Sequence, residues 1–194
     1  HGTDGIIFLE EAGNSYYYSR TRMDITGTIK IGNTTETVRG LSWFDHQWGD
    51  FSTNLLSWDW FSLQLDNGID LMIYQLRDKY DKPLLYTGSI TQNNVTEALL
   101  SSDFTLSQLG DQWTSKKTGY TYPIAWEIKI PKKNIHIKTR SKVENSEFDA
   151  QLTTYNHYWE GAVKIEGTHT GKGFMELYGY TNKKEPNASK SKKR

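Results

Sequence analysis

The stretch LSWDWFSLQLDNGIDLMIYQLRD, residues 56–78, decides the fold class. Two runs rich in aromatic and aliphatic residues flank Asp66-Asn67-Gly68, which supplies the positive backbone φ angles that a tight turn needs. Runs of this composition, joined by such a turn, predict an antiparallel β-hairpin. The chain is therefore expected to be built from β-strands.

The first strand of this hairpin has two different faces. Side chains alternate across a strand, which places Asp59, Phe61, Leu63 and Leu65 on one face and Trp58, Trp60, Ser62 and Gln64 on the other. Neither set is typical of a solvent-facing surface, so both faces are expected to be covered, as in a closed barrel. Tryptophans beside small polar groups favour a cavity for an apolar ligand. A tryptophan pair that packs the sheet against a neighbouring layer explains the same pattern.

Outward from the hairpin, apolar and polar residues keep alternating, and the 3.6-residue period of amphipathic helices is scarce. Only residues 93–102 are compatible with a short helix or turn. Further strands are predicted at residues 15–31, 36–44, 102–109, 122–130 and 134–140, with a second hairpin at 158–180. Regularly spaced strands with turn signals between them indicate an all-β sandwich or barrel.

Composition excludes several kinds of partner and site. The 23 Lys and Arg residues balance the 23 Asp and Glu residues, so no nucleic-acid partner is indicated. No apolar run approaches the roughly 20 residues of a membrane span, and no integral membrane segment is expected. The absence of cysteine excludes disulfides and thiolate ligands. The histidines show neither HxH nor HExxH spacing, so no metal site is predicted.

A second stretch, GLSWFDHQWGDF at residues 40–51, concentrates aromatic and ionisable side chains. If it is extended, Trp43, Asp45 and Gln47 lie on one side, and Phe44, His46 and Trp48 lie on the other. One interpretation is a packed aromatic seam in which His46 is structural. The other is the wall of a site where an acid or base works against an aromatic surface.

Five stretches, taken in order, resemble one known family. They are SYYYSRTRM (15–23), GLSWFDHQWGDF (40–51), WDWFSLQLDNGIDLMIYQLR (58–77), YPIAWEIKIP (122–131), and YWEGAVKIEG followed by GKGFMELYGY (158–180). The set is similar to the lipocalin-like family that includes bacterial carotenoid 1,2-hydratases, AttH-like predicted secreted hydrolases, fungal kievitone hydratase and Diels–Alder-type cyclases. The resemblance implies an all-β fold of lipocalin-like antiparallel β-barrels in tandem.

The position of the motifs predicts the domain organisation. The YYYS and DHQWG motifs lie late in the first barrel of the family, but here they fall within residues 16–49. Residues 1–52 are therefore expected to be the C-terminal part of an incomplete first barrel, residues 53–182 the second barrel, and residues 183–194 a basic disordered tail. Missing first-barrel residues or a partner chain would complete the fold. The resemblance also implies a secreted or cell-envelope-associated protein.

The resemblance implies candidate catalytic residues. In the hydratase branch, the His and Trp of the DHxWG motif and a downstream Tyr-x-Asp carry catalysis, and His46, Trp48 and Tyr74 match them. Position 76 is Leu where the pattern has Asp, so Asp59 or Asp70 would have to substitute for it. Asp45 completes the predicted catalytic group. The predicted ligand-binding residues are Trp43, Phe44, Trp58, Trp60 and Gln64.

The function expected from these residues is a hydratase- or isomerase-like enzyme that needs no cofactor. Its substrate would be a small hydrophobic molecule of isoprenoid or polyketide type. Addition of water to an alkene needs a proton donor, an ordered water and a surface that stabilises a developing cation, and tryptophan faces suit the last role. The alternatives are a non-catalytic lipocalin-like carrier of a hydrophobic ligand and a structural or interaction module.

Overall fold

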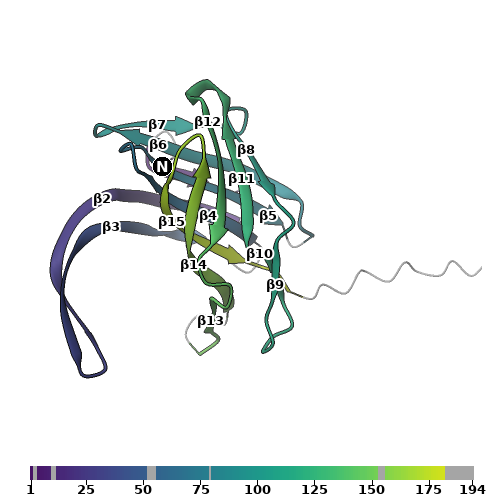
Figure 1. The fold of residues 1–194 in the computed structure, drawn as a ribbon. Helices are drawn as coiled ribbons and strands as arrows, with labels where there is room; N and C mark the ends of the chain where they lie inside the picture. Colours follow the sequence, from purple (N-terminus) through teal and green to yellow (C-terminus); the bar gives the residue numbers. More distant parts are fainter. Residues whose placement is uncertain (2–3, 10–11, 52–55, 79, 153–155, 182–194) are drawn as a thin grey trace, which may run out of the picture.

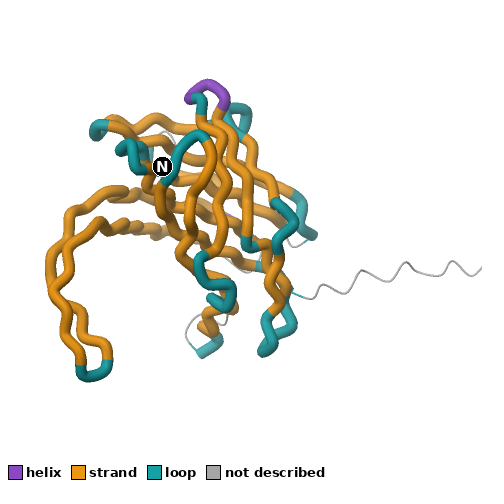
Figure 2. Tube along the Cα trace, in the orientation of Figure 1, coloured by secondary structure: helices purple, strands orange, loops and turns teal. Residues whose placement is uncertain are grey.

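The computed structural model describes residues 1, 4–9, 12–51, 56–78, 80–152 and 156–181 (Figure 1). Almost all of them lie in antiparallel strands or in the turns between them (Figure 2). The described residues contain no α-helix, and the helical element η3(Pro131–Lys133) is a short 3-10 turn. The all-β prediction is confirmed. Among the described residues, no helix has the length and apolar character needed to cross a bilayer.

The principal sheet has ten strands and is curled (Figure 1). Its order is β7-β6-β5-β4-β15-β14-β12-β11-β8, and β13 pairs with β14. The strands are β4(Leu56–Leu65), β5(Asp70–Asp78), β6(Pro83–Gln92), β7(Val95–Leu99), β8(Thr105–Gln108), β11(Ala125–Ile130), β12(Ile135–Ser141), β13(Glu147–Ala150), β14(Asn156–Gly167) and β15(Gly171–Tyr178). The predicted hairpin is β4–β5, and the positive φ of its turn falls on Gly68, at 84°.

The curl brings the two edge strands, β7 and β8, towards each other. Only residues 100–104 connect them, and five residues span at most about 18 Å. An ion pair of 2.6 Å between Lys133, in the turn after β11, and Glu97 of β7 also joins the two ends of the sheet. The sheet is therefore a half-barrel rather than a flat layer.

Residues 93–102 form an edge strand between two turns, where a short helix or turn was one expectation. Asn93 and Asn94 adopt positive φ angles of 52° and 62°, which close a tight turn after β6. β7 then pairs with β6 from Leu99 back to Val95. Pairing with a neighbouring strand outweighs the weak local helix preference of this segment.

The inside of the curl is the main hydrophobic core. Phe61, Leu63 and Leu65 of β4 are fully buried there, together with Ile73 of β5 and Trp159 of β14. Their partners on the opposite strands are also apolar, because alternation brings every second residue to the same face. The prediction that Phe61, Leu63 and Leu65 share one covered face is confirmed.

A second layer covers part of the outside of the curl. It consists of β1(Ile6–Phe8), β2(Gly13–Ile31) and β3(Thr34–Phe51), and β2 and β3 form a long ribbon that leaves the body of the molecule in Figure 1. Near its base this layer packs on the outer faces of β4 and β5, and Tyr17, Leu56, Met72 and Tyr74 are buried between them. A separate two-stranded sheet consists of β9(Gln112–Thr114) and β10(Thr121–Pro123).

Two features of the predicted domain organisation lie outside the described residues. One is the boundary near residue 52, which falls in the stretch between β3 and β4. The other is the basic tail at residues 183–194. The division into an incomplete first barrel and a second barrel stays a prediction.

Candidate functional site

A cavity of about 260 Å³ lies between the base of the β2–β3 ribbon and the outer face of the curled sheet. Its apolar wall comes from β3, β4 and β5 and from the residues before β2, and it includes the indoles of Trp58 and Trp60. The aliphatic and phenyl side chains in this wall are Leu9, Phe51, Leu56 and Leu76. Mostly apolar walls with a few polar groups are typical of small-molecule sites.

The polar side chains that reach this cavity come from four strands. They are Tyr17 on β2, Asp45 and Gln47 on β3, Tyr74 on β5 and Glu176 on β15. Alternation explains the set. In β3, Asp45 and Gln47 share the face that meets the sheet, and in β15 Glu176 points outward between the core residues Met175 and Leu177.

Glu176 is a carboxyl group held in a weakly solvated place. Its pKa is raised to about 7, chiefly by burial. A hydrogen bond from Trp58 opposes this rise, and the nearby carboxylates of Glu160 and Asp45 contribute to it. Trp58 Nε1 donates to Glu176 Oε1 at 2.7 Å. Glu160 lies directly opposite Glu176 in the β14–β15 register. The carboxyl group of Glu176 therefore exchanges its proton near neutral pH.

Asp45 is the second carboxyl group at the cavity. Burial raises its pKa, and hydrogen bonds, first of all from the Ser19 hydroxyl, oppose that rise. No lysine or arginine in the described part of the chain forms an ion pair with Asp45 or Glu176. Two carboxyl groups thus share an apolar cavity, and neither has a cationic partner among the described residues.

Two tyrosine hydroxyl groups complete the polar set. Trp60 Nε1 donates to Tyr17 OH at 2.9 Å, whereas the buried hydroxyl of Tyr74 has no hydrogen-bond partner among the described residues. Burial raises the pKa of both tyrosines, so each stays neutral and can donate a hydrogen bond. An unpartnered buried hydroxyl is costly. Its position at the cavity wall fits a polar group on a ligand.

The opposite face of the ribbon carries an aromatic surface. Trp48 stacks on Tyr16 with 5.4 Å between ring centroids, and the His46 ring lies 4.6 Å from that of Trp48. Tyr18 contacts the rings of Phe44, His46 and Trp48. Trp48 remains 45% exposed and Phe44 44%. We call Tyr16, Tyr18, Phe44, His46 and Trp48 the outer aromatic face.

The motifs and the fold agree with a comparison to known families. A family model described as AttH-like matches residues 1–180. The chain belongs to the AttH-like family. This confirms the family resemblance, which rested on five ordered motifs.

Individual relatives of this AttH-like chain include enzymes by name. It is 27% identical over 189 residues to the dehydratase asqC of Emericella nidulans, covering 91% of this chain and 54% of that protein. The crystal structure of a protein assigned as AttH from Nitrosomonas europaea is 27% identical, with a TM-score of 0.83, over 93% of this chain and 57% of that one. Kievitone hydratase of Nectria haematococca, at 19% identity and a TM-score of 0.71, has the same coverage and shares the fold. The chain spans little more than half the length of these relatives.

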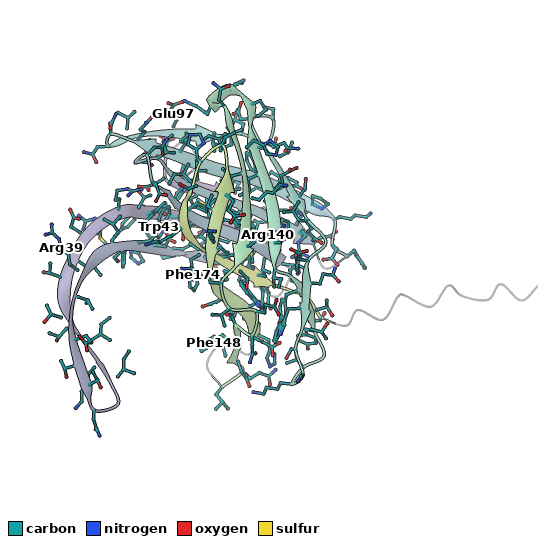
Figure 3. All side chains as sticks on the ribbon, viewed as in Figure 1. Arg39, Trp43, Glu97, Arg140, Phe148 and Phe174 are labelled. Carbon is teal, nitrogen blue, oxygen red and sulfur yellow. The ribbon has the colours of Figure 1, made fainter. Side chains whose placement is uncertain are left out.

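The structure brings some predicted site residues of the AttH-like chain together. Asp45, Tyr74, Trp58 and Trp60 all line the cavity. Trp43 packs edge-on against Trp60 with 6.4 Å between ring centroids. Figure 3 labels Trp43, which lies at the base of the β2–β3 ribbon.

Other predicted residues lie elsewhere. His46, Trp48 and Phe44 belong to the outer aromatic face, because alternation turns them away from Asp45. Gln64 Nε2 donates to the backbone oxygen of Thr21 at 2.7 Å and so ties β4 to β2. The roles implied for these four residues stay predictions.

The position two residues beyond Tyr74, where the family pattern has a carboxylate, is Leu76 in this chain. Leu76 does line the cavity, so an Asp at that position would face it. Neither suggested substitute reaches the site. Asp59 points into the curl, where Arg77 holds it, and Asp70 is bound by Arg22 at 2.6 Å. Glu176 supplies a carboxyl group to the same cavity.

Sequence reasoning missed Glu176 and Tyr17. The available signal was a single acidic residue in the apolar run GFMELYGY, residues 173–180, where alternation separates Glu176 from Met175 and Leu177. Tyr17 was hidden in a row of three tyrosines, whose outer members, Tyr16 and Tyr18, face the other way. In the described part of the chain, no group of three or more His, Cys, Asp or Glu side chains is arranged to hold a metal ion.

Proposed function

We propose that this AttH-like protein is a hydratase-like enzyme that adds water to, or removes it from, an apolar molecule without a cofactor. The observation that carries the proposal is the pair of carboxyl groups, Asp45 and Glu176, facing one apolar cavity with no cationic partner among the described residues. Such a pair has the properties of a general acid and a general base. The relatives named as a dehydratase and a hydratase support it.

The two carboxyl groups have distinct roles in the dehydration direction. Glu176, with a pKa raised by burial to about 7, gives its proton to the oxygen of the leaving hydroxyl as the C–O bond breaks. Asp45, ionised, takes a proton from the adjacent carbon, and the C–H electron pair becomes the new double bond. Water leaves, Glu176 is left ionised and Asp45 is left protonated. Hydration is the reverse sequence, and the same pair can shift a double bond by moving a proton.

The remaining cavity groups bind and orient the substrate. The ring faces of Trp58 and Trp60 stabilise positive charge at the reacting carbon by about 0.5 to 2 kcal/mol. The hydroxyl of Tyr74, which has no hydrogen-bond partner among the described residues, donates to an oxygen of the substrate. A cavity of about 260 Å³ suits a compact substrate or one part of a longer isoprenoid or polyketide-like chain.

A non-catalytic carrier of a hydrophobic ligand is the second candidate. Leu76, in place of the carboxylate expected from the hydratase pattern, makes the cavity wall more apolar and favours it. A carrier needs the apolar wall and the Tyr74 hydroxyl, but it has no use for a carboxyl group such as Glu176 that exchanges its proton near neutral pH. The two candidates therefore differ in their dependence on Glu176.

The outer aromatic face supports a further proposal about assembly. Tyr16, Tyr18, Phe44 and Trp48 are each more than 40% exposed. An isolated two-stranded ribbon is marginally stable in water. We propose that another layer of protein, from first-barrel residues or from a partner chain, packs on this face and completes the barrel to which the ribbon belongs.

Incubation of the protein with an apolar metabolite extract in isotopically labelled water tests the function. Mass spectrometry should find compounds that gain or lose one water, with the label in the hydrated product. Glu176→Gln should abolish the change while still retaining the same compounds on the protein. Glu166→Gln, at an exposed position of β14 outside the cavity lining, is the matched control. Retention of compounds without any water exchange by the wild type would establish the carrier instead.

A further inference from the structure

Asp45 is connected to a chain of hydrogen bonds that leads out of the cavity. Its Oδ1 accepts a hydrogen bond from the hydroxyl of Ser19. The imidazole of His1 follows, with Nε2 at 2.5 Å from Ser19 Oγ. On its other side, Nδ1 of His1 lies 3.2 Å from Oγ of Ser89. These four side chains form a continuous path from β3 through β2 to β6.

The number of protons on Ser19 determines the direction of this path. A serine hydroxyl has one proton, and an ionised Asp45 can only accept, so Ser19 donates to Asp45. Its oxygen must then accept the Nε2–H of His1. When Asp45 is protonated, both bonds can reverse, because a carboxylic acid donates and a neutral imidazole nitrogen accepts.

The surroundings of His1 fix its ring at the boundary between the cavity wall and solvent. Its backbone nitrogen donates to the backbone oxygen of Tyr17 at 2.8 Å, and its ring lies 4.5 Å from the Tyr17 ring. Ser89 is 3% exposed, whereas His1 is only half-buried. The imidazole therefore contacts a hydroxyl at each ring nitrogen, and the partial exposure of His1 lets it exchange protons with water.

We propose that Ser19 and His1 form a proton relay that removes the proton from Asp45 and returns it to the ionised form. This inference rests on the proposed function, in which each dehydration leaves Asp45 protonated. The Asp45 proton passes to Ser19 Oγ as the Ser19 proton passes to Nε2 of His1, which carries its other proton on Nδ1. Asp45 ends as a carboxylate, Ser19 as a hydroxyl and His1 as an imidazolium, which then releases one proton to water.

The relay resolves a specific difficulty of the cavity. Apolar walls and a bound substrate exclude the water that would otherwise remove the proton from Asp45. An unperturbed histidine side chain exchanges protons near neutral pH. Ser19 and His1 touch no cavity space, so they act on the reaction only through Asp45. They are positioning residues rather than catalytic ones.

Nuclear magnetic resonance titration tests the relay without a substrate. The groups that face Asp45 are Tyr17 from β2, Tyr74 from β5 and Glu176 from β15, and burial keeps the two tyrosines protonated near neutral pH. Glu176→Gln removes the titrating carboxyl group among them, so the measurement uses this variant as its background. Burial lowers the pKa of the His1 amino group, so its titration is followed separately from that of the His1 ring. The Asp45 carboxyl carbon, assigned with Asp45→Asn, should show a second inflection at the midpoint of the His1 ring nitrogens.

Variants of the bridging hydroxyl decide between a relay and simple proximity. Ser19→Ala should remove the second inflection of Asp45, and Ser19→Thr, which keeps a hydroxyl, should restore it. Ser15→Ala, on the same face of β2 and bonded to Gln47, is the matched control and should keep it. His1→Gln should also lose it, which provides the test if Ser19→Ala does not fold. No shared inflection in the background protein, or its persistence in Ser19→Ala or His1→Gln, would overturn the relay.

The relay and the proposed function fail separately. Absence of water exchange with the extract would reject the enzyme while leaving the coupled titration of Asp45 and His1 in place. Loss of turnover in Glu176→Gln, together with uncoupled titrations, would reject the relay alone.

Discussion

Two carboxyl groups on neighbouring strands show how differently the two faces of the sheet are used. Asp59 on β4 lies opposite Leu177 in the β4–β15 register, one residue from Glu176, but it points into the curl. Arg77 holds it with two hydrogen bonds of 3.1 Å, and Tyr180 OH donates to it at 2.6 Å. Glu176, on the outer face, has a hydrogen bond from Trp58 and no ion pair with a described residue.

This difference indicates that the Asp59 carboxyl group stabilises the fold, whereas the Glu176 carboxyl group can interact with a ligand. Burial raises the pKa of Asp59 to about 6, against the opposing charge of Arg77. The guanidinium is tied to the rest of the barrel end through Asp81, at 2.5 Å, and the backbone oxygen of Tyr178. Both carboxylate oxygens of Asp59 therefore accept hydrogen bonds within the protein. Glu176 keeps acceptor capacity that faces a cavity.

Removal of the cation from the inner face should have the largest effect. Arg77→Met leaves Asp59 buried without its charge partner, which should lower the free energy of unfolding by about 3 to 5 kcal/mol. Urea denaturation followed by tryptophan fluorescence measures it. On the outer face, where the carboxyl group has no ion pair with a described residue, Glu176→Gln should cost less than about 1 kcal/mol. Similar losses in both variants would mean that the two faces do not differ in this way.

The second largest effect is expected for the tryptophans that line the cavity. Trp60→Ala should weaken binding of the neutral apolar dye Nile red by more than about 1 kcal/mol, because an indole that lines the cavity is lost. Trp113→Ala is the matched control, since Trp113 packs at the β9–β10 hairpin away from the cavity. A fluorescence titration measures both. Equal affinities of Trp60→Ala and the wild type would assign Trp60 to packing alone.

The pH dependence of stability should identify Glu176. Its pKa is raised from 4.5 to about 7, so between these values the folded protein holds more protons than the unfolded chain. The contribution of Glu176 to the free energy of unfolding is therefore fully present below pH 4.5, and it is lost as the pH rises to about 7. Glu176→Gln should remove about 1 to 2 kcal/mol of the wild-type loss between about pH 5 and about pH 8, allowing for partial solvent screening. Identical pH profiles would contradict the raised pKa.

The smallest effect is expected on the outer aromatic face. His46→Gln should change the free energy of unfolding and the Nile red affinity by no more than about 0.5 kcal/mol, because His46 contacts exposed rings and not the cavity. Thermal denaturation and the dye titration measure this. A large loss of turnover with unchanged dye binding would instead support the catalytic role that the family resemblance implies for His46.

Local pattern was sufficient for the strands and for the partition of their faces. The Asp66-Asn67-Gly68 turn and the alternation in residues 56–65 predicted the β4–β5 hairpin and the separation of Phe61 from Trp60. These features depend on neighbours in the chain, because the period of a strand is two residues. The order of five motifs was sufficient for the family, which the match over residues 1–180 confirmed.

The sequence by itself determined the all-β class, the family and the two residue sets of each strand, since these follow from short-range stereochemistry and motif order. Only the tertiary structure decided which set of β3 faces a cavity: alternation separates Asp45 from His46, but it does not say on which side another layer packs. It also decided the members of the site. Trp58 and Glu176 are 118 positions apart in the chain, and they meet because the last strand, β15, returns to pair with β4 in the middle of the sheet. Pairing between strands that are distant in the chain depends on how both faces of the sheet are buried. A short stretch of sequence does not contain that information.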